Sequence, residues 1–306
     1  MRESIYFIII AIVFIFPCEI SAQNVENPEA VRMRREQAAR HRRFDNVQNT
    51  VFDSKTTPNN QANVINGDRK ALPFKQKLTR EQKSYLLPEQ TDSVRYTSFL
   101  AQPKTGLIKL FPDAGCEKNA SLLRADKECL NWIPNSAFYS SREREHTTEY
   151  LADIRLEKDF LISDGVLSHG ILVALGNVPL ENVTLNSAGM NFLVNYQPEQ
   201  KNKDAFTQFV QITKGVKSDG FLYKNTLPAV ADNTYALRVI AYRGRFLQTF
   251  RGFRFNVLDG DERADSTLVF RVIRKSEDGS ISLLWKELQR RDAPKLTSEK
   301  RKNKIL

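Results

Sequence analysis

Short segments in which apolar and polar residues alternate recur between residues 149 and 285, and this pattern constrains the fold more than any other feature. Residues 149–156, 191–196 and 235–241 place apolar side chains at every second position. Residues 166–175 form a longer, largely apolar run that is typical of a central strand. Because successive side chains of a strand point to opposite faces, the alternating segments predict strands with one face on a core.

The clearest local unit is a β-hairpin near the end of the chain. Apolar residues alternate on both sides of a turn, Glu277–Ser280, in which Gly279 can supply the positive φ that a tight hairpin needs. The apolar positions are Leu268, Phe270 and Val272 before the turn and Ile281, Leu283 and Trp285 after it. We therefore expect two long antiparallel strands that share one buried face.

Only residues 204–216 carry a convincing helical pattern, with an acidic start and Phe206, Phe209, Val210 and Ile212 on one side. Many short strands and one core helix predict a mostly β domain, an antiparallel sandwich or a barrel-like fold. We expect this domain over residues 93–288, with an irregular, disulfide-stapled lobe at 93–145. A disordered polar and basic tail precedes it over residues 23–92, and a basic tail follows over residues 289–306.

Residues 1–22 have the parts of a secretory signal peptide. Arg2 precedes twelve apolar residues, Ile5–Phe16, and Ala22 offers a small residue at the cleavage site. A helix of twelve residues spans about 18 Å, short of the roughly 30 Å of a bilayer core, so an uncleaved anchor is the weaker alternative. Lipoprotein processing at Cys18 is a third. We expect a secreted or periplasmic, extracytoplasmic protein, outside the cell or at the cell envelope.

The net charge of +10 first suggests a nucleic-acid partner, but its distribution argues against one. Residues 93–288 hold 25 basic and 23 acidic residues, whereas the two flanking tails carry most of the excess. A nearly neutral domain lacks the surface that neutralises phosphates, so we expect no nucleic-acid partner. Six arginines in the tail segment 28–44 allow weak contact with an anionic membrane surface, although a solvated spacer is the favoured interpretation.

Two cysteines remain after signal cleavage, Cys116 and Cys129. In an oxidising compartment they predict a disulfide, which would contribute about 3 kcal/mol by the loop-entropy account. A metal site and a catalytic thiol are the alternatives, and the intervening residues supply no further Cys or His for a metal.

Two segments offer weak chemistry. Asp164, Ser168 and His169 supply the residue types of a hydrolytic site, but adjacent strand residues point to opposite faces. The acidic segment Asp259–Asp265 breaks the twelve-residue calcium-loop pattern at Arg263, so a hydrophilic loop between strands is favoured. We expect no metal and no cofactor. Asn119 and Asn182 begin glycosylation sequons, which matter only in a eukaryotic secretory pathway.

Residues 242–255 form the best binding candidate, because four arginines alternate with five aromatics without any acidic residue. Arg245, Arg251 and Arg254 suit phosphate, sulfated glycan or carboxylate ligands. The competing interpretation is a pair of core strands whose arginines cap the outside. We expect an exported, non-catalytic β-rich module that binds a protein or an anionic glycan. The alternative is an exported hydrolase acting on glycan or peptide.

Overall fold

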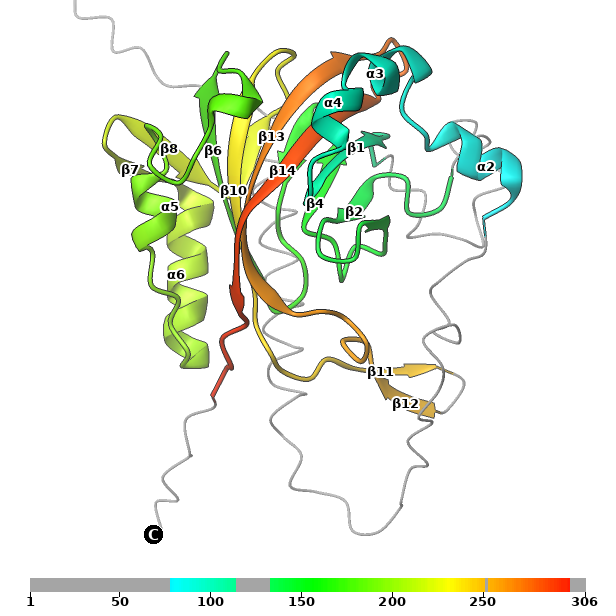
Figure 1. Cartoon of the computed structure of the whole chain (residues 1–306). Coiled ribbons are helices and arrows are strands. Elements are labelled where there is room, and N and C mark those ends of the chain that lie inside the picture. The colour runs from blue at the N-terminus through cyan, green and yellow to red at the C-terminus, as the bar shows by residue number, and fades with distance from the viewer. Residues whose placement is uncertain (1–77, 114–132, 251–252, 298–306) are drawn as a thin grey trace, which may run out of the picture. The chain divides into compact units, whose positions relative to one another are not determined.

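The computed structural model describes residues 78–113, 133–250 and 253–297. These residues form a mostly β structure built from antiparallel sheets (Figure 1). The signal segment, most of the N-terminal tail, Cys116, Cys129 and Arg251 lie outside the described residues. The predictions made for those segments therefore stay predictions.

The larger sheet has seven strands, and every neighbouring pair in it is antiparallel. In spatial order they are β1 (Thr105–Leu110), β14 (Ile281–Asp292), β13 (Ala264–Lys275), β10 (Thr234–Ala241), β6 (Ser168–Gly176), β8 (Phe221–Lys224) and β7 (Val216–Ser218). The predicted hairpin is confirmed as β13–β14, and Gly279 in its turn has φ 77°.

A second sheet has five short antiparallel strands. Their order is β3 (Glu145–His146), β2 (Phe138–Ser140), β4 (Ile154–Glu157), β5 (Phe160–Ile162) and β9 (Thr226–Pro228). Apolar side chains of both sheets belong to one buried cluster, so the two sheets form a sandwich. The cluster includes the predicted apolar faces of 235–241 and of the β13–β14 hairpin, which the structure confirms.

Helices cover the opposite face of the larger sheet. The long helix α6 (Asn202–Lys214) confirms the predicted core helix and buries Ala205, Phe209 and Ile212. A short helix, α5 (Asn191–Asn195), replaces the strand that the sequence predicts at 191–196. Figure 1 shows both helices beside β6, β7 and β8. Since β10 has covered faces on both sides, all eight of its residues are buried.

The cause of the wrong strand prediction is a tertiary contact. Arg238 on β10 donates hydrogen bonds from one terminal nitrogen to the carbonyls of Leu193 (2.5 Å) and Tyr196 (2.7 Å) at the end of α5. These acceptors would otherwise lack partners at a helix C-terminus. The pattern of the six residues 191–196 fits both a strand and a helical turn, and the buried cation stabilises the helix.

The remaining helices are short: α2 (Arg80–Tyr85), α3 (Gln90–Arg95) and α4 (Thr97–Leu100) precede β1, and the 3-10 helix η4 (Leu180–Asn182) follows β6 in the sequence and contacts β13. Helix α3 crosses the expected boundary between the tail (to residue 92) and the domain (from residue 93), and Asp92 pairs with Arg274 on β13 at 2.7 Å. At the other end β14 continues to Asp292, past the expected limit at residue 288.

Candidate functional site

The segment with alternating arginines and aromatics forms a hairpin of its own. Its strands are β11 (Leu247–Phe250) and β12 (Phe253–Asn256), which among the described residues pair only with each other in a two-stranded sheet. In Figure 1 this hairpin lies at the lower right, away from the labelled strands of both larger sheets. The interpretation as a pair of core strands is therefore wrong, because neither strand belongs to the sandwich.

The base of the hairpin is well packed. Phe246 is buried, and its ring lies 5.5 Å from that of Tyr150. The side-chain oxygen of Asn256 accepts a hydrogen bond from the Phe246 backbone N–H at 2.7 Å, and the Val257 N–H donates to the Phe246 carbonyl at 2.8 Å. These contacts fix the two chain segments where they leave the sandwich.

The strand register separates the two faces of the hairpin. Thr249 lies opposite Arg254, and Gln248 lies opposite Phe255. Since paired residues share a face and neighbours alternate, Arg254 and Thr249 lie on one face and Phe255 lies on the other. Arg254 is exposed, and so is Arg245, which precedes β11. Two of the three predicted ligand-binding arginines therefore reach solvent.

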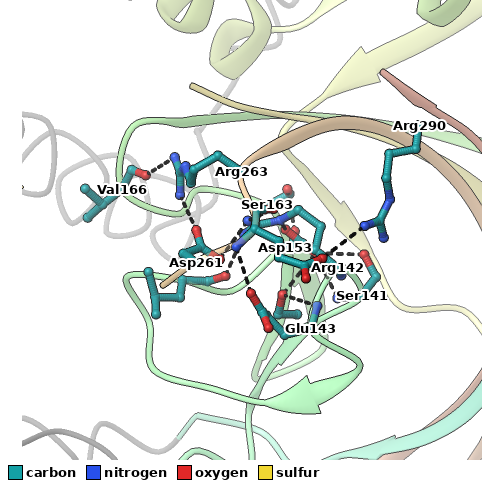
Figure 2. A network of polar contacts seen from close by, with 12 residues as sticks. Ser141, Arg142, Glu143, Asp153, Ser163, Val166, Asp261, Arg263 and Arg290 are labelled. Carbon is teal, nitrogen blue, oxygen red and sulfur yellow. Dashed lines mark hydrogen bonds and ion pairs between the residues drawn. The ribbon is translucent and has the colours of Figure 1, made fainter. Parts of the chain in front are cut away.

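A buried ion-pair network lies beneath this base (Figure 2). Asp153, fully buried, accepts hydrogen bonds from the Ser141 hydroxyl (2.7 Å) and from Arg142 Nε (2.8 Å). Arg142 Nη1 lies 2.8 Å from one oxygen of Asp261, and Arg263 Nη1 lies 2.9 Å from the other. Two guanidinium groups and two carboxylates thus share one interior site without net charge.

The network also ties down the backbone around the hairpin. Arg263 donates to the carbonyl of Tyr242 at 3.0 Å and to that of Val166 at 2.8 Å. Burial lowers the pKa of Arg263 to about 10, and the neighbouring Arg142 acts in the same direction. Asp261 opposes both effects, since a carboxylate between two guanidinium groups favours their charged forms. The loop between β12 and β13, the turn at Val166 before β6 and the start of the 242–255 segment are therefore held together by Arg263.

Residues 259–263 form the predicted loop between β12 and β13, and Asp259 and Glu262 are exposed there, but two acidic side chains of the segment 259–265 are buried in ion pairs. The side chain of Asp261 is fully buried, and Asp265 forms a second buried pair with Arg238 at 2.6 Å. Arg142 is likewise buried, although it begins the charged sequence Arg142–Glu145. Its contact with Asp261 spans 119 residues, so no local pattern could indicate the pair.

The residues of the proposed hydrolytic site do not converge. Asp164 forms an ion pair with Arg155 at 2.9 Å, whereas the His169 ring stacks on Phe209 of α6 with centroids 5.1 Å apart. His169 Nδ1 lies 3.3 Å from the Tyr242 hydroxyl oxygen. Complete burial lowers the pKa of His169 to about 3, so the ring is neutral at ordinary pH. It is a core residue and lacks the access to solvent that a catalytic base requires.

Among the described residues there is no group of three or more His, Cys, Asp or Glu side chains placed to hold a metal ion. Within the same residues, no helix has the length and apolar character needed to cross a bilayer. Comparison with protein-family models, curated proteins and solved structures gives no match. The functional argument therefore depends on the contacts described above.

Proposed function

We propose that this chain is an exported, non-catalytic binding module that holds an anionic ligand or protein partner on the β11–β12 hairpin. The single observation that carries the proposal is a projecting hairpin with exposed Arg245 and Arg254, in a segment that contains no acidic residue. Export is the expectation from residues 1–22.

The rigid base supports this proposal. An arginine binds a carboxylate, sulfate or phosphate through a planar fork of donors, and a fixed backbone reduces the entropy lost on binding. Two separate contacts hold the base of the hairpin: Arg263 of the buried network donates to the Tyr242 carbonyl, and the Asn256 side-chain oxygen accepts from the Phe246 N–H. By contrast, the buried arginines Arg142, Arg238 and Arg263 have their donors directed to protein acceptors.

The test uses the full mature chain and a heparin column. The reversed-charge variants Arg245→Glu and Arg254→Glu should elute at lower salt than the unmodified protein, because exposed charge contacts are screened by salt. Lys203→Glu on α6 and Lys217→Glu on β7 are the matched controls, since both lysines are exposed and lie outside the hairpin. Equal shifts in all four variants would show that only net charge matters and would overturn the proposed site.

A further inference from the structure

Among residues 78–113, 133–250 and 253–297, no strand pairs with the outer edge of β11. The bond from the Val257 N–H to the Phe246 carbonyl makes these residues a hydrogen-bonded pair, and pairs alternate along an antiparallel ladder. Leu247 and Thr249 therefore direct their N–H and C=O groups away from β12. Among the described residues, no backbone hydrogen bond outside the strand ladders involves either of them.

The outer edge of β12 differs from that of β11. The Asn256 carbonyl already accepts a hydrogen bond from the Asp259 N–H at 3.1 Å, so the loop that follows β12 occupies part of this edge. A two-stranded sheet is marginally stable in water, and a third strand would satisfy the unpaired groups of β11. An incoming strand is therefore expected to pair with β11 and not with β12.

The charge of the hairpin selects the kind of segment. A second copy of the hairpin would bring a second set of arginines to the same edge without any acidic residue between them, which is unfavourable. If the added strand places a carboxylate opposite Thr249, that carboxylate lies on the same face of the sheet as Arg254, because Arg254 pairs with Thr249 from the other side, in β12. Arginine can then bind that carboxylate through two hydrogen bonds.

We infer that β11 binds an extended acidic peptide segment of a partner protein, which adds to the hairpin as a third strand. This inference rests on the proposed function, because it names the partner of the same site. Main-chain hydrogen bonds to Leu247 and Thr249 supply affinity, and Arg245 and Arg254 select acidic sequences.

The probe is a short labelled peptide in which glutamate alternates with valine. Its control is the same peptide with every backbone N–H methylated, which keeps the charge and removes the donors of both edges of the strand. Fluorescence anisotropy should show binding of the first peptide, and the dissociation constant of the second should be at least about tenfold higher. Equal affinity for both peptides, or no binding of the first, would overturn strand addition.

A variant of the protein gives a second, independent test. Thr249→Pro removes an outward N–H, a position where an edge strand tolerates proline, whereas Thr249→Val retains it. The proline variant should lose peptide affinity with an unchanged melting temperature, and the valine variant should retain affinity. If Arg254→Glu weakens heparin and peptide binding while Thr249→Pro leaves peptide affinity unchanged, the anionic site stands and strand addition fails. If Arg254→Glu changes neither heparin nor peptide binding, the proposed function itself fails.

Discussion

Replacing Asp261 by asparagine should destabilise the protein far more than the same change at Asp259, two residues earlier in one loop. The two oxygens of Asp261 accept from two different guanidinium groups, at 2.8 Å from Arg142 and 2.9 Å from Arg263. An asparagine side chain has only one acceptor oxygen and must turn its NH₂ group toward one of these cations. It also leaves a net positive charge in the interior.

Breaking a buried ion pair from one side costs about 3–5 kcal/mol, which is a large part of the roughly 5–15 kcal/mol that stabilises a folded domain. Asp259 is exposed and accepts a hydrogen bond from the Asn256 side chain, which an amide oxygen can also do. Asp259→Asn should therefore change the free energy of unfolding by less than about 0.5 kcal/mol.

Urea unfolding followed by tryptophan fluorescence measures both variants under the same conditions. If Asp261→Asn is already unfolded in buffer while Asp259→Asn is folded and has a measurable melting temperature, that difference alone gives the expected order. A pair of variants with equal stability would refute the buried ion-pair network around Asp261.

Two further predictions concern the interior. Because the folded-state pKa of His169 is about 3, below its ordinary value of 6.5, the unfolded chain binds a proton first as pH falls; His169 therefore costs stability only below pH 6.5, by up to about 1.4 kcal/mol per pH unit. His169→Gln should make the free energy of unfolding less dependent on pH between 6.5 and 4, and an unchanged slope would contradict the burial of this ring. A Cβ at Gly106 would lie 2.4 Å from the Trp285 ring, so Gly106→Ala should destabilise by about 1–3 kcal/mol in urea unfolding. An unchanged urea midpoint would show that the indole does not lie over Gly106.

Elements with a strong local period were predictable from the sequence. The β13–β14 hairpin has alternating residues on both sides of a glycine turn, and helix α6 has an apolar face over several turns. At 191–196 the pattern covers too few residues to separate a strand from a helix. Contacts of α5 with Arg238, 45 residues away from Leu193, decide that case.

For the candidate site, the sequence predicts the residues, and only the structure shows where they lie. Arg245 and Arg254 stand out in the sequence because arginine and aromatic residues alternate there without acids. That β11 and β12 leave the sandwich and pair only with each other was not predictable, since residue alternation is the same in a core strand and in a projecting hairpin.

Strand periodicity, turn chemistry and the mostly β class follow from the sequence by itself, because they depend on residues a few positions apart. Only the tertiary structure decides which charged residues are buried. Arg142 meets Asp261 across 119 residues and Arg238 meets Asp265 across 27, and in each case folding brings the partner that makes burial of the charge tolerable. The Arg142–Asp261 pair shares its carboxylate with Arg263, which holds the Tyr242 carbonyl at the start of the hairpin segment.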